Sequence, residues 1–593
     1  MKKHLFIFLI FAILTVAMTF PLVFKINSHI PGFQFTDEPY GSIWQFWMLN
    51  YSFHNHLPIL HTTLIGYPSG VDLFSTGYSP YIYVFLMSIL SIATSPLIAY
   101  NLILLFNIFL SGIVVYMLVF YLTKNIFSGV FSGVAFAFCP YQFARLWQHP
   151  TLTLNEWIPL CLLSAILLKD KFSKATAVLF LCSILILFSF DLHIMLFGFY
   201  VFIIFMVYLI LFNWRTKLFK KPSLFKEDIK YFKRVVVILL LAFVILLPQY
   251  FPFIKNALRF SASSIASGFN PYRRPFEDLF SQSAKPLSYF LPSAQHPIFG
   301  KFTEYFVGDF LYGVSFTEHA LYLGWTTIIF AFLAFRFWRR RNKNSSNQEE
   351  KFFIGYFLLL VIVSWLFSQP PWWKFGSIKI YLPSFFIYKV LPMIRAYARF
   401  GLLVMLAVSV LAGFGLKIVL KKFKTNLSKI LATCLFSGLL LFEFLNFPPF
   451  KVIDLTVHPQ IYDWLKNEPK DYIIAEYPLD ANGQNEMYKF HQTIHQKKII
   501  NATIPGTRAN ELAQLIDKLS MPDTAGILKW MGVKYVLVHT NPYKETNLLS
   551  EKVELDKIRR NKGLKFIKNL DDIEVYEVVA TPVKPVITEG GAK

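Results

Sequence analysis

Two adjacent carboxylates, Asp37 and Glu38, lie just after the first long apolar run of the chain, within the stretch Gln34–Trp47. They therefore lie at the mouth of a hydrophobic segment and precede aromatic residues that can lie along a bilayer surface. A carboxylate in such a place can take the proton from an acceptor hydroxyl, which is the role of a general base. The alternative is a structural role, in which Asp37 caps a short helix that begins at Pro39.

Other charged side chains lie at the ends of apolar runs. Loops rich in lysine and arginine mark the cytoplasmic side of a membrane protein, and these side chains lie at the opposite, outer ends of the runs. Charged groups close to a bilayer are costly in free energy and tend to face a polar cavity. Because these groups come from separate segments, we predict that they converge with Asp37 and Glu38 in a polar pocket at the outer leaflet. The alternative is that each one anchors its own helix end at the headgroups. These residues are Arg145, His149, Glu156, Asp191, His193, Arg395 and Arg399.

Such a pocket contains the groups that are needed to transfer a sugar from a polyprenyl phosphate. The reaction needs a base for the acceptor hydroxyl, for which Asp37 and Glu38 are the candidates. It needs cationic donors for the leaving phosphate, which arginine binds through two parallel hydrogen bonds. It also needs an apolar groove for the lipid tail, and the aromatic-rich helices are the candidates for it. The candidates for the phosphate are Arg395, Arg399, Arg145 and His149, with Asp191, His193 and Glu156 completing the pocket.

Arg395 and Arg399 share one face of a helix if residues 393–400 are helical, because they are four positions apart. Two unpaired guanidinium groups at that spacing repel each other, so we expect an anionic group beside them. The candidates are lipid headgroups, the acids of the loop Glu277–Glu318, and the phosphate of the donor.

The composition is that of a helical membrane protein. Of the 593 residues, 55% are hydrophobic, and the mean hydropathy is +0.48, which is far more apolar than a soluble protein of this length. Several runs approach or exceed the roughly 18–20 apolar residues that span a bilayer. The net charge of +23 suggests nucleic acid at first, but most basic clusters lie between apolar runs, where they mark cytoplasmic loops. We predict a polytopic α-helical protein of the plasma membrane, with no nucleic-acid partner.

The basic clusters predict about eleven transmembrane spans with the N-terminus in the cytoplasm. The first outer loop, residues 25–79, carries the two acids. Residues 39–51 are predicted to form an interfacial helix with tryptophan at headgroup depth, and residues 81–92 a second helix that lies in or dips into the membrane. Residues 140–150 are predicted to form an outer loop. The spans are expected at about residues 5–24, 96–121, 126–138, 152–168, 175–190, 194–212, 235–253, 320–335, 352–367, 401–419 and 430–445.

The last part of the chain, residues 448–593, has a different pattern. Short apolar strands alternate there with helical patterns, which predicts a compact α/β domain. After eleven spans this domain lies outside the cell, and residues 1–447 form the transmembrane domain. The strands are expected at residues 471–477, 533–539, 564–567 and 573–578, and the helices at residues 461–466, 508–519 and 524–531.

No motif for a cofactor is evident. The four cysteines lie in or at apolar runs and lack the spacing of zinc ligands or of a disulfide framework. His54, His56 and His61 show no clear metal geometry, and the sequence contains neither a Walker loop nor a GxGxxG motif. We therefore expect no direct use of a nucleotide, and the sequence leaves a divalent metal open.

Six short motifs are spread over nearly the whole chain, at Thr36–Pro39, Tyr67–Gly70, Ala99–Leu102, Met393–Phe400, Glu476–Pro478 and Gln492–His495. Together they resemble multi-pass membrane proteins of the GT-C glycosyltransferase superfamily. More narrowly, they are similar to the YfhO-like group and to membrane proteins labelled "6-pyruvoyl-tetrahydropterin synthase-related", although the zinc-histidine pattern of the soluble synthase is absent. The resemblance implies a lipid-phosphate-linked sugar donor and an acidic base in the first outer loop, a role that falls on Asp37 with Glu38 as its neighbour. Some members bind a divalent metal with such acids.

Three functions follow as hypotheses. The first is a membrane glycosyltransferase that moves a sugar from a polyprenyl-phosphate-linked donor to a glycan, lipid or protein acceptor of the envelope, at the outer face of the membrane. The second is a transporter or flippase of lipid-linked glycans, although transporters favour inverted repeats and charges at mid-membrane. The third is a non-catalytic membrane scaffold whose α/β tail binds envelope partners. The lack of an internal repeat and the boundary position of the acids favour the first over the second.

Overall fold

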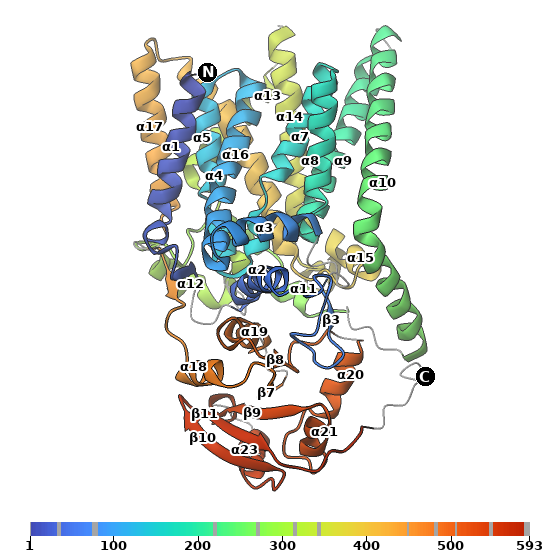
Figure 1. Cartoon of the computed structure of the whole chain (residues 1–593). Helices are drawn as coiled ribbons and strands as arrows, with labels where there is room; N and C mark the ends of the chain where they lie inside the picture. Colours follow the sequence, from blue (N-terminus) through green and yellow to red (C-terminus); the bar gives the residue numbers. More distant parts are fainter. Residues whose placement is uncertain are drawn as a thin grey trace.

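The computed structural model describes residues 2–32, 37–73, 81–217, 222–267, 273–311, 317–340, 345–446, 450–479, 484–504, 507–544 and 549–585. A bundle of roughly parallel helices forms one end of the molecule, and an α/β domain forms the other (Figure 1). Two further helices lie across the bundle between these parts. The N-terminus lies at the free end of the bundle, opposite the α/β domain.

The bundle helices follow the apolar runs, and each predicted span overlaps one helix. Among the described residues, eight stretches are long and apolar enough to cross a membrane. The helices α1, α8 and α13 are shorter, with 17, 14 and 15 residues. The chain is therefore a polytopic helical membrane protein, and the number of crossings stays a prediction. The helices are α1 (Lys2–Met18), α4 (Pro96–Thr123), α5 (Ile126–Ala137), α7 (Trp157–Asp170), α8 (Lys174–Leu187), α9 (Leu192–Lys217), α10 (Pro222–Ser267), α13 (Trp325–Arg339), α14 (Ser345–Ser368), α16 (Gly401–Leu420) and α17 (Asn426–Glu443).

Local capping residues set the helix ends. The helix α4 begins after Ser95, whose hydroxyl accepts a hydrogen bond from the backbone N–H of Ile98 at 3.2 Å. It ends at Lys124, which has a positive φ of 54°. Asn125 then caps α5 by accepting a hydrogen bond from the N–H of Ser128. Two residues are thus enough to separate these helices, where the predicted spans leave residues 122–125 between them.

The prediction of an outer loop at residues 140–150 is wrong. The chain instead forms the helix α6 (Pro140–Gln148) and the 3-10 turn η2 (Pro150–Thr153). Every residue of α6 before Gln148 is buried, because the aromatic and apolar residues between its polar ones pack into the end of the bundle. The segment therefore belongs to the core of the membrane domain.

The segments at the α/β end of the bundle are mostly short. The exception is α10, which continues well beyond its predicted end at residue 253 and extends past the bundle (Figure 1). The others are η1 (Leu22–Lys25), α11 (Asp278–Ser281), η3 (Pro286–Tyr289), α12 (Gly300–Leu311), η4 (Thr317–His319), the hairpin of β4 (Trp372–Phe375) and β5 (Ile378–Tyr381), α15 (Pro383–Val390) and η5 (Tyr397–Phe400).

The helices α2 (Glu38–His54) and α3 (Tyr81–Ala93) lie across the end of the bundle (Figure 1). Both were expected from the sequence, but the expected place of the tryptophan is wrong for Trp44. This side chain is only 2% exposed, and its indole N–H donates to Oε1 of Gln492 in the α/β domain at 2.7 Å. The face of α2 that carries Trp44 therefore packs against protein and not at lipid headgroups.

The α/β domain is built on a mixed five-stranded sheet in the order β10-β11-β9-β7-β8. The strand β7 runs parallel to β8 and β9, and β11 runs antiparallel to β9 and β10. All predicted strands and helices of this domain are present, while β6, β8, α19, α22 and α23 were not predicted. The strands are β7 (Ile473–Tyr477), β8 (Lys498–Ile499), β9 (Val533–His539), β10 (Leu564–Leu570) and β11 (Ile573–Val578). The helices are α18 (Gln460–Asn467), α19 (Gln484–His495), α20 (Arg508–Leu515), α21 (Thr524–Trp530), α22 (Thr540–Lys544) and α23 (Leu549–Arg559).

The first outer loop completes this domain. Alternate residues of β7 point to opposite faces of the sheet, so that Ile473 packs with α20, α21 and α23, while Ile474 packs with α18, α19 and α2. The strand β1 (His29–Pro31) pairs with β6 (Val452–Asp454). The short hairpin of β2 (His61–Thr62) and β3 (Val71–Asp72) also belongs to the loop.

Backbone hydrogen bonds join the same loop to the edge of the sheet. The N–H of Ile499 in β8 donates to the carbonyl of Leu64, and the N–H of Gly66 donates to the carbonyl of Asn501, both at 2.9 Å. The loop and the α/β domain therefore form one structural unit, although more than 400 residues separate them.

Candidate active site

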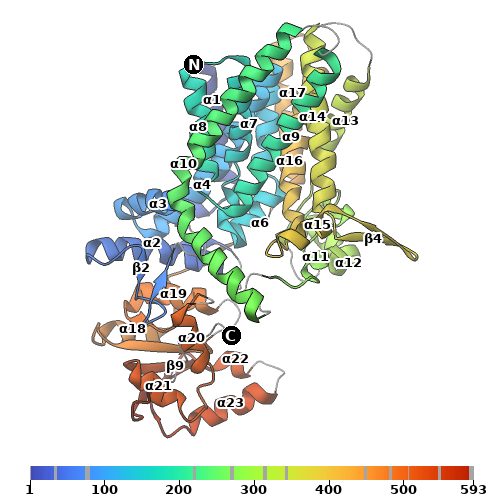
Figure 2. The same ribbon diagram turned by 90° about the vertical axis from the view of Figure 1, so that its right-hand side faces the viewer.

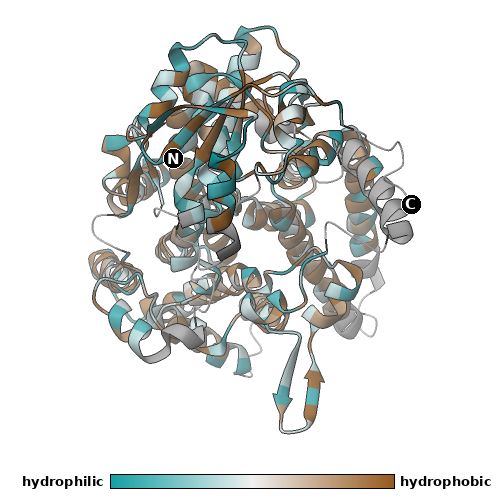
Figure 3. Ribbon diagram, turned by 90° about the horizontal axis from the view of Figure 1, so that it is seen from below, coloured by the Kyte–Doolittle hydropathy of each residue, from teal (hydrophilic) through white to brown (hydrophobic). Residues whose placement is uncertain are grey.

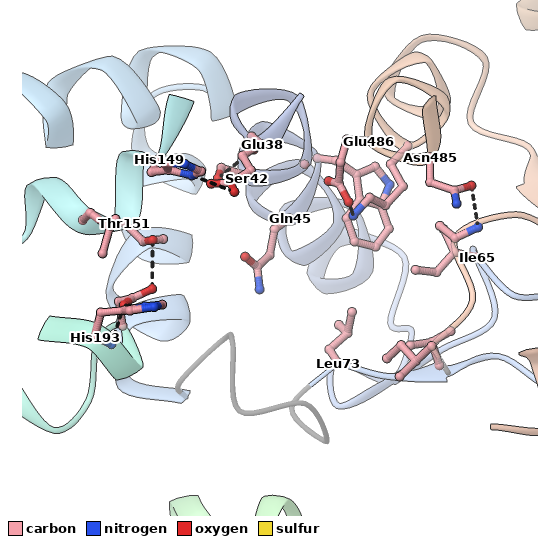
Figure 4. A pocket seen from close by; sticks show the side chains of 18 of the residues that line it. Glu38, Ser42, Gln45, Ile65, Leu73, His149, Thr151, His193, Asn485 and Glu486 are labelled. Atoms are coloured by element: carbon pink, nitrogen blue, oxygen red, sulfur yellow. Dashed lines mark hydrogen bonds and ion pairs between the residues drawn. The ribbon is translucent and has the colours of Figure 1, made fainter. Parts of the chain in front are cut away.

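A cavity of about 570 Å³ lies where the bundle, the first outer loop and the α/β domain meet. Glu38 and Gln45 line it from α2, and His149 and His193 line it from the bundle. The helix α19 lines the opposite wall. Figure 4 shows Glu38 beside His149 on one side, and Asn485 and Glu486 on the other. The predicted convergence of charged groups from separate segments is therefore found, with the α/β domain as an added wall.

Glu38 faces this cavity, whereas Asp37 is not among its lining residues. The Oε1 atom of Glu38 lies 2.8 Å from Nδ1 of His149, and the Glu38 side chain remains 47% exposed. Asp37 caps α2, and its Oδ1 atom accepts a hydrogen bond from the backbone N–H of Glu38 at 3.0 Å. Thr36, the first residue of the motif Thr36–Pro39, lies outside the described residues. The catalytic role expected of Asp37 stays a prediction.

Glu318 is the buried carboxylate behind the cavity, and it joins two of the predicted arginines. Arg145 donates to both of its oxygens, at 3.0 and 2.8 Å. Arg399 donates to Oε1 from Nε at 3.0 Å and from a terminal nitrogen at 2.8 Å. Burial alone would raise the pKa of Glu318, but the guanidinium groups of Arg145 and Arg399, with His149, outweigh it and hold the pKa well below its ordinary range.

These contacts change the roles expected for the cations. Arg145 is fully buried and bound by Glu318, and it does not line the cavity. Arg395 and Arg399 do line it, but residues 393–396 are not helical, so the predicted shared helix face is wrong. Arg395 pairs instead with Asp278 at 3.1 Å. Three kinds of anion were expected beside these arginines: lipid headgroups, the acids of the loop Glu277–Glu318, and the donor phosphate. The structure shows the loop acids there, with Asp278 beside Arg395 and Glu318 beside Arg399.

A second chain of hydrogen bonds leads from Arg399 to the start of α9. A terminal nitrogen of Arg399 donates to Nε2 of His193 at 3.1 Å, which leaves Nδ1 of His193 to donate to Asp191 at 3.0 Å. Thr151 donates to the other Asp191 oxygen at 3.1 Å. Burial would raise the pKa of Asp191, but His193 and Arg399 lower it below its ordinary range. Asp191 therefore stays ionised and fixes the His193 ring.

Glu156 was predicted to belong to the pocket, but it lies elsewhere. It is fully buried at the start of α7, and neither of its carboxylate oxygens has a hydrogen-bond partner among the described residues. It does not line the cavity. The position of this acid next to an apolar run did not reveal that it is fully buried away from the cavity.

Three cavity groups were not predicted from the sequence. Arg274 adds a cation to the lining, and Glu486 and Lys489 come from α19. Glu486 and Lys489 pair at 2.6 Å. A Cβ atom at Gly41 would lie 1.5 Å from a Glu486 oxygen, so glycine allows α2 to approach α19 closely. The helix α19 has a mostly polar sequence, which gave no signal of its place beside the site.

The donor set does not form a metal site within the described part of the chain. No group of three or more histidine, cysteine, aspartate or glutamate side chains is placed there to hold a metal ion. The acids of the cavity are instead paired with cations or histidines: Glu38 with His149, and Asp191 with His193. The divalent metal that the resemblance allows stays a prediction.

A sequence family described as Domain of unknown function (DUF6311) matches residues 38–440 of this chain. No curated protein sequence matches it. Among solved structures, the arabinofuranosyltransferase AftD from Mycobacteria is similar, with 14% identity and a TM-score of 0.51, over 97% of this chain and 40% of that one.

Two further structures are similar over larger shares of their own length. The archaeal oligosaccharyltransferase AglB from Archaeoglobus fulgidus, in complex with an inhibitory peptide and a dolichol-phosphate, has 13% identity and a TM-score of 0.51, over 95% of this chain and 73% of that one. ArnT from Cupriavidus metallidurans bound to undecaprenyl phosphate has 11% identity and a TM-score of 0.50, over 97% and 99%. These structures confirm the GT-C resemblance of the fold, and the narrower likeness to the YfhO-like group stays a prediction. The chain has a GT-C-like fold and belongs to the family described as Domain of unknown function (DUF6311).

Proposed function

We propose that this protein is a membrane glycosyltransferase that transfers a sugar from a polyprenyl-phosphate-linked donor to an envelope acceptor at the outer face of the membrane. The observation that carries the proposal is the cavity, which is lined both by Glu38 with its His149 partner and by the cations Arg274 and Arg395. The GT-C-like fold supports it, as do the dolichol-phosphate bound to AglB and the undecaprenyl phosphate bound to ArnT.

Glu38 is the proposed general base. Its carboxylate takes the proton of an acceptor hydroxyl, and the freed oxygen attacks the anomeric carbon of the sugar. The bond between that carbon and the phosphate oxygen breaks, and the polyprenyl phosphate leaves with the electron pair. His149 donates to Glu38 from Nδ1, which holds the carboxylate in place while the outer part of the side chain stays accessible to the acceptor.

Arg274 and Arg395 are the proposed ligands of the leaving phosphate. Within the described part of the chain, Arg395 pairs with Asp278 through one terminal nitrogen, and its side chain is 41% exposed, so donors remain for an anion in the cavity. Arg399 has most of its donors directed to Glu318 and His193. We assign Arg399 a positioning role, in which it orients the two histidines of the cavity.

Substitution of Glu38 by glutamine tests the proposal. Glu38→Gln keeps the size of the side chain but removes the base, so we expect transfer to fall by roughly 100-fold or more, with donor binding unchanged. The assay uses purified protein in lipid vesicles with a panel of synthetic polyprenyl-phosphate sugars, and it measures released polyprenyl phosphate by mass spectrometry.

Asp37→Asn is the matched control, because asparagine caps a helix as well as aspartate does. We expect near wild-type transfer from this variant. Wild-type turnover by Glu38→Gln would rule out Glu38 as the base. A loss confined to Asp37→Asn would assign the base to Asp37 instead.

A further inference from the structure

The hairpin of β4 and β5 has two different faces. Cross-strand partners share a face, and neighbours along a strand alternate between faces. Trp373 pairs with Ile380 and Phe375 pairs with Ile378, so that one face is wholly apolar. The other face carries Trp372 opposite Tyr381 and Lys374 opposite Lys379. The ribbon is therefore amphipathic.

This apolar face is not covered by the described part of the chain. Phe375 and Ile378 are 62% and 66% exposed, and Ile380 is 47% exposed. The hairpin projects sideways from the end of the bundle, away from the α/β domain (Figures 2 and 3). An isolated two-stranded hairpin is marginally stable in water, so a second apolar surface is needed to hold this one in place.

The position of the hairpin identifies that surface. The strand β4 begins at Trp372, directly after the candidate membrane span Gln348–Ser368. On the apolar face, the ring of Trp373 lies 5.6 Å from that of Trp365, near the end of the span. On the other face, Trp372 stacks on Phe276 of an outer segment at 5.5 Å. The apolar face is thus continuous with the membrane span, and the lysine face points the opposite way.

The two lysines add a requirement for negative charge. Lys374 and Lys379 are directly opposite each other and exposed. Like charges directly opposite across a ladder are destabilising unless an anion lies between them. Lys379 also lies over the Trp372 ring at 4.8 Å, and tryptophan is enriched at the level of lipid headgroups.

We infer that this hairpin is a membrane-surface anchor, whose apolar face enters the bilayer leaflet and whose two lysines bind the phosphates of anionic lipids. Amphipathic elements at the interface lie about 5–10 Å into the boundary between headgroups and acyl chains. At that depth the headgroup phosphates surround the lysine face. The anchor holds the segment between α14 and α16, which also carries Arg395, against the bilayer.

Spin labels on neighbouring positions test this orientation. Ile378→Cys and Lys379→Cys place a label on the apolar face and on the lysine face. The exposed Cys182 and Cys434 are replaced by alanine, and the two buried cysteines stay. In nanodiscs we expect the label at 378 to be several-fold more accessible to oxygen than to a nickel chelate, and the label at 379 to show the reverse order. Equal accessibility of both labels to the nickel chelate would contradict the inference that this hairpin is a membrane anchor.

Lipid charge provides the second arm of the test. We expect the label at 378 to move deeper when anionic lipid replaces part of a zwitterionic bilayer. This response is lost in Lys374→Gln, and circular dichroism serves as the check that all variants fold. If the depth does not depend on anionic lipid, the lysines do not bind it and that part of the inference is wrong.

Discussion

At the scale of single residues, two carboxylates of the site differ in their partners and in their exposure. Glu318 is 2% exposed and held by two arginines, so its charge is fixed and its oxygens are occupied. Glu38 has one histidine partner and a half-exposed side chain. A buried acid whose charge is balanced by two arginines holds those side chains in place, while an accessible acid can exchange a proton with a substrate.

Glu318→Gln tests the structural role. The variant leaves Arg145 and Arg399 buried without a counter-charge, and breaking a buried pair costs about 3–5 kcal/mol. We expect a lower free energy of unfolding at pH 7, measured by thermal unfolding in detergent. Glu277→Gln removes an exposed acid of the same outer segment, and we expect little change from this control.

The pH dependence has a definite sign. The folded-state pKa of Glu318 lies below its ordinary value of 4.5, so its contribution to stability is present above that value. It is lost as the pH falls below 4.5 toward the lowered pKa. We therefore expect the stability difference between wild type and Glu318→Gln to shrink in that range. An equal difference at pH 7 and in strong acid would contradict this role.

At the scale of the elements, α16 forms the centre of the bundle. Nearly all of its residues are buried, and it packs on α13, α14, α4 and α5. Small residues let membrane helices approach closely. At Gly415, an added Cβ atom would lie 1.9 Å from the backbone oxygen of Phe330 in α13. This contact is with backbone, so it cannot be relieved by a side-chain rotation.

Gly415→Ala tests this crossing. We expect it to destabilise the protein by about 1–3 kcal/mol, which is the usual cost of overpacking a core. Gly438→Ala in α17 is the matched control, because nothing lies within 4 Å of its added Cβ atom. Alanine favours a helix by up to about 1 kcal/mol over glycine, so this control is expected to be neutral or stabilising. Equal thermal stability of the two variants would rule out the close crossing.

At the scale of the whole molecule, the N-terminus and the α/β domain lie at opposite ends of the bundle (Figure 1). This arrangement requires an odd number of crossings between them, as the eleven predicted spans provide. The cavity lies at the α/β end, so the side on which this domain lies is also the side on which the proposed transfer takes place.

Cysteine labelling in intact cells tests the orientation. Lys565→Cys in the α/β domain and Lys421→Cys after α16 are both at exposed positions. We expect an impermeant maleimide to label position 565 directly and position 421 only after permeabilisation, because basic loops stay in the cytoplasm. Wild-type protein reports background labelling of its own cysteines. Labelling of position 565 only after permeabilisation would invert the topology.

The sequence alone determined the features that depend on neighbouring residues. Hydropathy located the spans, because a membrane helix needs about 20 apolar residues in a row. Local patterns located β9 and β11 at their observed bounds. Ser95 and Asn125 act within three residues of themselves. The convergence of charged groups was also predictable, since a charge at a bilayer boundary needs a polar surrounding.

Only the tertiary structure decided which charged groups meet. Arg145 and Glu318 are 173 positions apart, and His149 and Glu38 are 111 apart, so no local pattern reports these pairs. The aromatic spacing of α2 predicted a helix with tryptophan at the lipid headgroups, whereas the partner of Trp44 is Gln492 in the α/β domain. Side-chain partners depend on how distant segments pack. The physical reason is that a buried charge without a counter-charge is costly in free energy, so it pairs with an opposite charge that is close in space, however far apart the two residues are in the sequence.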